Sequence, residues 1–112
     1  MTGAFRILSV KSVAGLSGHG IGRSLWEAPA VPNHSSNSFE RMDDFALEPG
    51  LVIAVEPMVN QTTDQVRQLP DHWTIVSRDG LPSAHFEHTI AITKDGPQVL
   101  TSGPEGQGWA LS

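Results

Sequence analysis

Four side chains in otherwise apolar or glycine-rich stretches have the chemistry of a metal centre. His19 lies in SGHGIGR, Glu56 interrupts LVIAVEPMV, and His85 and Glu87 lie in AHFEHTIAIT. An imidazole and two carboxylates make a donor set for a hard or borderline divalent metal such as Mn, Fe, Co or Zn. A carboxylate within an apolar strand is costly to bury unless a cation or an arginine meets it. Together, one imidazole and the two carboxylates indicate a divalent metal site more strongly than any of them does alone.

Strand periodicity indicates which of these side chains share a face. Alternation in LVIAVEPMV puts Glu56 on the face of Val52 and Ala54. In AHFEHTIAIT it separates two sets, Phe86, His88, Ile90 and Ile92 on one face and His85, Glu87, Thr89 and Thr93 on the other. Three alternatives remain open: a glycine-rich loop with an incidental histidine, solvated edge-strand carboxylates, and hydrogen-bonded histidines at positions 85 and 88.

Short strands and turns account for most of the chain. Residues 5–13 are expected to form a strand that leads into the glycine loop, and residues 27–50 read as loop, with two prolines and a Glu-Pro-Gly turn. Further strands are expected in the runs LVIAVEPMV, HWTIVSRDG, AHFEHTIAITKDG and PQVLT. Asp79-Gly80 and Asp95-Gly96 are hairpin signals. Residues 102–112 are expected to be a frayed tail.

Composition narrows the class of protein. A chain of 112 residues is expected to form one small domain. Its net charge of −5 disfavours a nucleic-acid or anionic-membrane surface, and the absence of cysteine excludes disulfides and Cys-ligated metals. With no apolar run of membrane-spanning length and no signal-peptide pattern at the start, the sequence is typical of a cytoplasmic protein.

The order of motifs resembles a known family. GHGIGR, EAPAVPN, LEPGLVIAVEPMV and WTIVSRDGLPSAHFEHTIAITKDGPQVLT follow one another as in the C-terminal half of type I methionine aminopeptidase, a pita-bread metallopeptidase. The resemblance is collinear from about residue 18 to 101. It implies an α+β, strand-dominated half-domain of the pita-bread type, with residues 1–112 as a single partial domain. A prolidase-like or creatinase-like relative is disfavoured by the match through WTIVSRDG and SAHFEHT.

The resemblance also implies a reaction and a ligand set. It assigns His19, Glu56 and Glu87 as metal ligands, and Glu87 and His85 as candidate catalytic residues. The family reaction removes the initiator methionine from nascent polypeptides, with two divalent metals that activate water and polarise the scissile carbonyl. The implied substrate is therefore a polypeptide N-terminus, and the implied cofactor a divalent metal.

Several positions depart from the family pattern. Two further aspartate ligands belong to the family's N-terminal half, and Asp43 and Asp44 stand in the wrong order to replace them. Trp26 occupies the place of a substrate-contacting histidine, which makes it a candidate substrate-binding residue, and His85 stands where many relatives have glutamine.

These departures limit what the chain is expected to do alone. Two carboxylates and a neutral imidazole should hold at most one metal, weakly, so activity would require a complementing half. An uncovered sheet edge and apolar face also favour self-association. The alternative function is that of a non-catalytic remnant that binds a peptide or protein partner.

Overall fold

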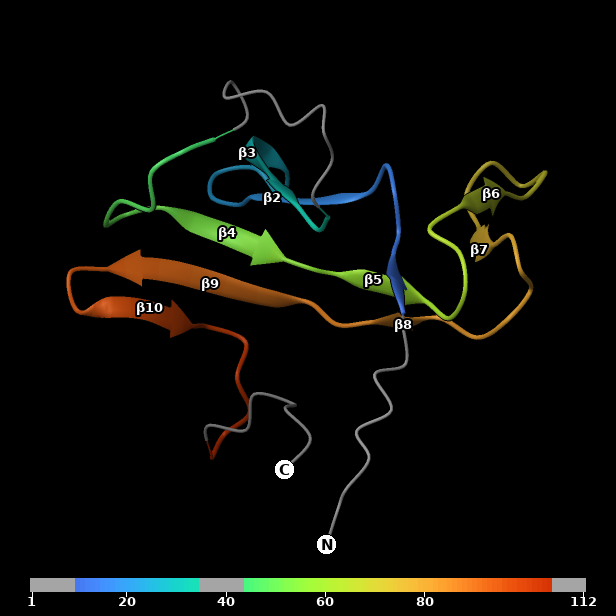
Figure 1. The fold of residues 1–112 in the computed structure, drawn as a ribbon. Helices are drawn as coiled ribbons and strands as arrows, with labels where there is room; N and C mark the ends of the chain where they lie inside the picture. The colour runs from blue at the N-terminus through green and yellow to red at the C-terminus, as the bar shows by residue number, and fades with distance from the viewer. Residues whose placement is uncertain (1–9, 35–43, 106–112) are drawn as a thin grey trace, which may run out of the picture.

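The computed structural model describes residues 10–34 and 44–105, and Figure 1 shows them as a set of short strands. No helix occurs in this part of the chain, so none there could cross a membrane. The strands are β1 Lys11–Ser12, β2 Ser17–Gly20, β3 Glu27–Pro32, β4 Val52–Val55, β5 Met58–Asn60, β6 Val66–Gln68, β7 Ile75–Ser77, β8 Ala84–His85, β9 His88–Thr93 and β10 Gly96–Val99.

Five strands form the main sheet, in the order β10-β9-β4-β2-β3, with every neighbouring pair antiparallel. A three-stranded sheet, β1-β5-β8, continues from one end of it, and β6 pairs with β7 alone. In Figure 1, β4 leads directly into β5, and β8 leads into β9 beside them. Each of these two segments therefore belongs to both sheets.

The register shows that the two long segments form one unbroken antiparallel pair. Ala54 lies opposite Thr89 in the main sheet, and Met58 lies opposite His85 in the smaller sheet. Met58 is four residues after Ala54, and His85 is four residues before Thr89, so neither strand has an extra residue between the two pairs. Continuing this register places Glu56 opposite Glu87, at the junctions where β4 gives way to β5 and β8 to β9.

The SGHG stretch is a strand and not the loop expected from its glycines. Gly18 and Gly20 lie in β2, between β4 and β3. A Cβ on Gly18 would collide with the Ala54 carbonyl oxygen, and one on Gly20 with the Ala28 carbonyl oxygen. The glycines are needed because neighbouring backbones approach β2 closely.

Gly18→Ala is expected to lower the free energy of unfolding by about 1–3 kcal/mol, because the backbone of β4 must move to admit the methyl group. Gly22→Ala is the matched control, since its Cβ would meet only the end of the flexible Glu27 side chain. Urea unfolding followed by circular dichroism measures both changes. Equal midpoints for the two variants would contradict the close approach of β2 and β4.

Residues 27–32 correct a second expectation, because they form β3 and not a loop. The two prolines at positions 29 and 32 suggested a loop. β3 is an edge strand, however, and an edge strand tolerates residues that lack a backbone N–H. Residues 35–43 of the expected loop, residues 5–9 of the expected first strand, and residues 106–112 of the expected tail lie outside the described part of the chain.

The two Asp-Gly signals have different outcomes. Asp95-Gly96 joins β9 to its partner β10, as predicted. Asp79-Gly80 turns the chain between β7 and β8, which lie in different sheets, so it does not make a hairpin of paired strands. Asp79 instead accepts hydrogen bonds from Ser77 Oγ (2.5 Å) and Thr62 Oγ1 (2.6 Å). These bonds lower the pKa of its carboxyl from 3.8 to about 2.

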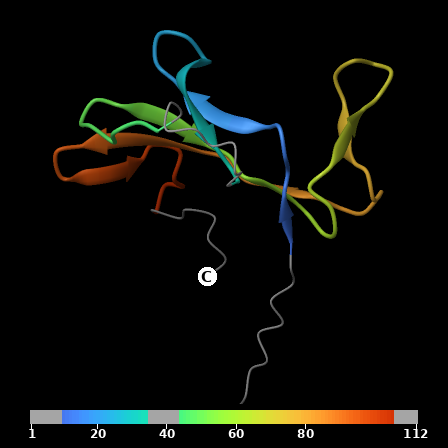
Figure 2. The same cartoon turned by 45° about the horizontal axis from the view of Figure 1, so that its top comes forward.

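The apolar side chains are poorly covered. In the described residues the buried apolar side chains are Val13, Ile53 and Ala54, whereas every residue of β9 is only partly buried. The β6–β7 hairpin projects away from the main sheet (Figure 2), and Trp73 next to β7 is 86% exposed. The expected strand-dominated architecture is confirmed, but it surrounds a very small core.

Candidate metal centre

Three potential donors meet on one face of the main sheet. His19 comes from β2, Glu56 from the β4–β5 junction and Glu87 from the β8–β9 junction. One donor atom from each side chain lies within 4.8 Å of the other two. The side chains of His19 and Glu56 are each 15% exposed, while Glu87 is exposed to solvent.

The register explains this convergence. His19 lies opposite Ala54, and Ala54 lies opposite Thr89. Residues that are paired across strands, or two apart along a strand, point to the same face. Glu56 is two positions after Ala54, and Glu87 is two positions before Thr89. The three side chains therefore share a face, as the strand periodicity predicted for Glu56 with Ala54.

The hydrogen bonding of His19 points its free nitrogen at Glu56. Nδ1 lies 2.9 Å from the Gly20 carbonyl oxygen, which can only accept, so Nδ1 carries the proton. A neutral ring then presents the lone pair of Nε2 to Glu56 Oε1, 3.3 Å away. Two acceptors facing each other need a cation or a further proton between them.

The spacing of these atoms fits a shared cation. Two donors about 2.1 Å from one tetrahedral ion are separated by roughly 3.4 Å. The observed 3.3 Å between His19 Nε2 and Glu56 Oε1 agrees with that edge length. A carbonyl that fixes the outer ring nitrogen is also the usual support for a metal-binding histidine. The residues present therefore fit a divalent metal.

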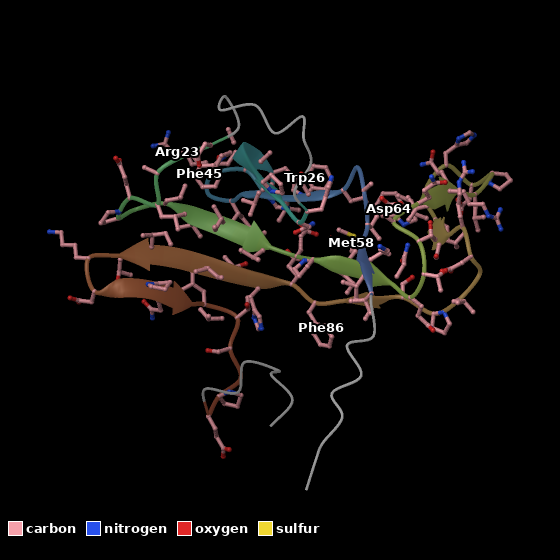
Figure 3. All side chains as sticks on the ribbon, viewed as in Figure 1. Arg23, Trp26, Phe45, Met58, Asp64 and Phe86 are labelled. Atoms are coloured by element: carbon pink, nitrogen blue, oxygen red, sulfur yellow. The ribbon has the colours of Figure 1, made fainter. Side chains whose placement is uncertain are left out.

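Trp26 covers one side of this group. Its ring centroid lies 5.3 Å from that of His19, with 41° between the planes, yet 76% of Trp26 remains exposed. Figure 3 labels Trp26 beside β2 and β3, above β4 in this view. A shallow hollow of about 340 Å³ lies beside both rings, lined by Ser17, Gly18, His19, Trp26, Glu27, Pro29 and Ala30. A substrate-binding role for Trp26 stays a prediction.

His85 approaches the same glutamate from its other oxygen. His85 Nε2 lies 3.5 Å from Glu56 Oε2, and the His85 side chain is 46% exposed. His88 behaves differently, because its Nδ1 lies 2.9 Å from Thr101 Oγ1. The hydrogen-bonded alternative therefore applies to His88. Asp44 is exposed and is not part of the donor group, and Asp43 lies outside the described residues.

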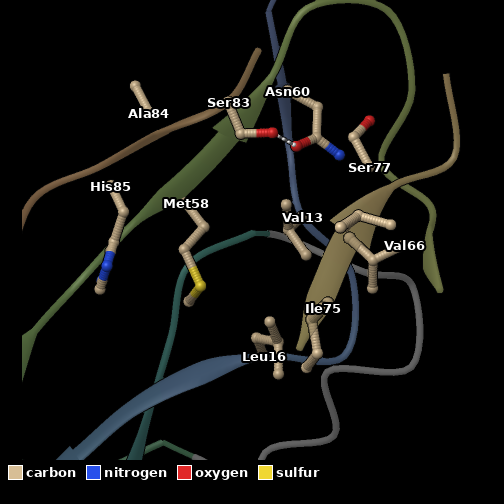
Figure 4. Close-up of a pocket in the computed structure, with 11 residues that line it drawn as sticks. Val13, Leu16, Met58, Asn60, Val66, Ile75, Ser77, Ser83, Ala84 and His85 are labelled. Carbon is tan, nitrogen blue, oxygen red and sulfur yellow. Dashed lines mark hydrogen bonds between the residues drawn. The ribbon is translucent and has the colours of Figure 1, made fainter. Parts of the chain in front are cut away.

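A mainly apolar pocket of about 240 Å³ begins at His85 and Met58 (Figure 4). It extends over Val13, Leu16, Val66 and Ile75 to a polar end formed by Asn60, Ser77 and Ser83. Asn60 is 2% exposed, and its Oδ1 accepts a hydrogen bond from Ser83 Oγ at 2.7 Å. Its Nδ2 has no partner among the described residues. Sequence reasoning missed Asn60, although a polar residue ending the strand MVN was a signal for it.

The antiparallel sheet thus carries on one face an imidazole and two carboxylates, the donor set of a metal-dependent protein. Residues 7–94 match the model of metallopeptidase family M24, and the chain belongs to that family.

Its relatives are methionine aminopeptidases. The chain is 48% identical over 85 residues to methionine aminopeptidase 1 of Bacillus subtilis, covering 75% of this chain and 32% of the relative. It is 42% identical over 91 residues to methionine aminopeptidase of Aquifex aeolicus, covering 81% and 34%. The chain thus spans about a third of the length of these relatives.

A solved structure supports the same fold. Methionine aminopeptidase from Thermotoga maritima superposes with a TM-score of 0.74 at 38% identity. The match covers 84% of this chain and 36% of that one. The pita-bread assignment is therefore confirmed.

Proposed function

We propose that this chain supplies the C-terminal part of a methionine aminopeptidase metal centre, whose reaction is hydrolytic removal of methionine from the N-terminus of a nascent polypeptide. The observation that carries the proposal is the convergence of His19, Glu56 and Glu87 within 4.8 Å. The methionine aminopeptidases among its relatives support the choice of reaction. A nascent polypeptide substrate fits the cytoplasmic location expected from the sequence.

The residues of this chain hold the metal and balance its charge. His19 offers a neutral nitrogen, while Glu56 and Glu87 offer two negative charges, enough for one divalent ion. A bound divalent ion polarises a carbonyl and lowers the pKa of a water ligand. One imidazole with carboxylates suits Mn, Fe, Co or Zn. A second ion at this centre needs further donors beyond these three.

The surroundings of the donors fit a short apolar side chain and a peptide. The pocket that begins at Met58 and His85 is lined mainly by apolar side chains, as a thioether requires. Trp26 lies tilted beside His19 and lines a separate shallow hollow, where a following peptide unit can lie. Glu87 is exposed to solvent, so its carboxylate can contact water or substrate.

The apolar side chains of the sheet that remain exposed need a further polypeptide segment to cover them. Only Val13, Ile53 and Ala54 are buried apolar residues in the described part, and the buried Asn60 amide has no acceptor there. An orphaned buried donor and an uncovered apolar face both disfavour the chain alone. We infer that a segment equivalent to the unmatched part of the longer relatives covers this face and completes the ligand set.

Reconstitution tests this function. The 112-residue chain is mixed with the portion of the Bacillus subtilis relative that it does not match, with Mn²⁺ or Co²⁺ present, and methionine release from a Met-Ala-Ser peptide is followed. We expect release above the metal-only background from the mixture and none from either part. Release by the 112-residue chain alone, lost on chelation and restored by metal, would contradict the need for a second segment. A complex that forms and binds metal without turnover would favour the non-catalytic remnant.

A further inference from the structure

A buried side-chain amide with a free N–H closes one end of the pocket shown in Figure 4. Asn60, the last residue of β5, is 2% exposed, and its Oδ1 accepts a hydrogen bond from Ser83 Oγ at 2.7 Å. Its Nδ2 is buried and has no hydrogen-bond partner among the described residues. Because nearly all buried polar groups in folded proteins are hydrogen-bonded, this amide indicates an acceptor that comes from outside the described part of the chain.

This polar end of the pocket lies away from the metal donors. Asn60 follows Met58 by two positions and Glu56 by four, so the three side chains share a face. Four residues of strand span roughly 13 Å, which is beyond the reach of a methionine side chain held at the donors. The polar end therefore has a different occupant from the end near His85.

The polar atoms at this end match one kind of chemical group. Asn60 Nδ2 offers a donor. Ser83 Oγ donates its hydrogen to Asn60, and its oxygen can still accept. Ser77 Oγ likewise donates to Asp79 Oδ1 at 2.5 Å and can still accept. An amide carries an acceptor and a donor side by side, so it can bond to both kinds of atom. A carboxylate would instead face the hydroxyl oxygens, and a cation would face the Nδ2 hydrogens.

Apolar side chains from separate parts of the chain line the approach to this amide. Val13 and Leu16 lie between β1 and β2, while Val66 and Ile75 belong to the β6–β7 hairpin. The hairpin pairs with neither of the other sheets, so it can move from the pocket without breaking a strand pairing. An aliphatic side chain beside a peptide unit fits this lining, because the side chain covers the apolar walls while the peptide unit meets the polar end.

We propose that Asn60 recognises a backbone peptide unit of the polypeptide segment that covers this face, with an aliphatic side chain of that segment in the apolar part of the pocket. The proposal rests on the proposed function, which requires such a segment, and it assigns the contact that binds it. A polypeptide is the occupant because the chain spans about a third of the length of its relatives. The pocket wall is also incomplete, since Ile75 is still 44% exposed.

This role predicts effects of opposite sign on stability and on association. In the free chain the unpaired Nδ2 lowers stability, because its hydrogen bond to water is lost on burial and not replaced. Asn60→Leu puts an apolar side chain of similar size in its place, so the urea midpoint of the free chain should stay the same or rise. The substitution also removes the donor to the incoming peptide unit. We therefore expect the affinity for the segment to fall at least about tenfold.

Fluorescence anisotropy measures this affinity, with the full 112-residue chain titrated into a labelled segment. The segment is the portion of the Bacillus subtilis relative that this chain does not match. Asn60→Asp is the second variant, because it keeps the shape of the side chain but lacks the N–H, and it should lose affinity as well. Gln61→Leu is the matched control, since this exposed amide already donates to the Pro82 carbonyl at 3.2 Å. It should bind the segment as wild type does.

The outcomes separate this contact from the proposed function. Wild-type affinity in Asn60→Leu or Asn60→Asp would overturn the contact and leave the proposed function intact. A urea midpoint of Asn60→Leu below that of wild type, at equal protein concentration, would also overturn it, because Asn60 would then stabilise this chain by itself. A segment that does not bind the wild-type chain would overturn both.

Discussion

Glu87→Gln is expected to lower the affinity of the chain for its first divalent metal by about 100-fold or more. Outer groups that merely orient a ligand cost about 10–100-fold when removed, so loss of a charged direct ligand should cost at least as much. Because Glu87 is exposed, the substitution should leave the strands in place. The affinity is measured by isothermal titration with Mn²⁺.

His19→Ala should have a similar effect, since it removes the only neutral donor of the group. The control is Glu48→Gln, which removes an exposed carboxylate from the turn before β4 and leaves the donor group untouched. Titration curves for Glu87→Gln and His19→Ala that match that of Glu48→Gln would show that the three residues do not form a site.

The second large effect concerns assembly. At micromolar concentration the 112-residue chain should sediment as a dimer or larger species. Its exposed apolar side chains include Leu25, Leu47, Ile75, Phe86 and Leu100. Fully burying an exposed apolar side chain gains about 1.5–3 kcal/mol. These side chains are 44–73% exposed, so covering each one gains part of that amount, and several together are a substantial fraction of the roughly 5–15 kcal/mol that stabilises a typical domain. Adding the segment used for reconstitution should replace this self-association with a one-to-one complex.

Sedimentation velocity distinguishes the possibilities. A sharp monomeric boundary together with cooperative thermal unfolding would mean that the chain covers its own apolar face, against the expectation. A large species that persists after the second segment is added would mean that the exposed face does not fit that segment.

The sequence was sufficient for much of the site because strand pairing obeys simple periodicity. Glu56 stands out within an apolar run, and its shared face with Ala54 follows from alternation alone. Glu87 lies opposite Glu56 because of the register between the two strands, and this register cannot be predicted from the sequence of either strand alone. The family resemblance supplied that information, and the register agrees with it.

Other features could not be predicted from local patterns. The glycines around His19 indicated a loop. They lie in a strand, because the backbones of β4 and β3 approach β2 too closely to leave room for a side chain at Gly18 or Gly20. The prolines in β3 were read as strand breakers, because nothing local marks a segment as an edge strand. Asp79 accepts a hydrogen bond from Thr62, which is distant in the sequence. The burial of the Asn60 amide without a hydrogen-bond acceptor also depends on residues that are distant in the sequence.

The central claim is that His19, Glu56 and Glu87 bind one divalent ion, and X-ray absorption at the metal edge tests it most directly. The chain is loaded with one equivalent of Zn²⁺. We predict one imidazole nitrogen and carboxylate oxygens at about 2.0–2.2 Å, with the imidazole signal lost in His19→Ala and retained in His85→Gln. A spectrum with no imidazole contribution, or one unchanged in His19→Ala, would contradict the account.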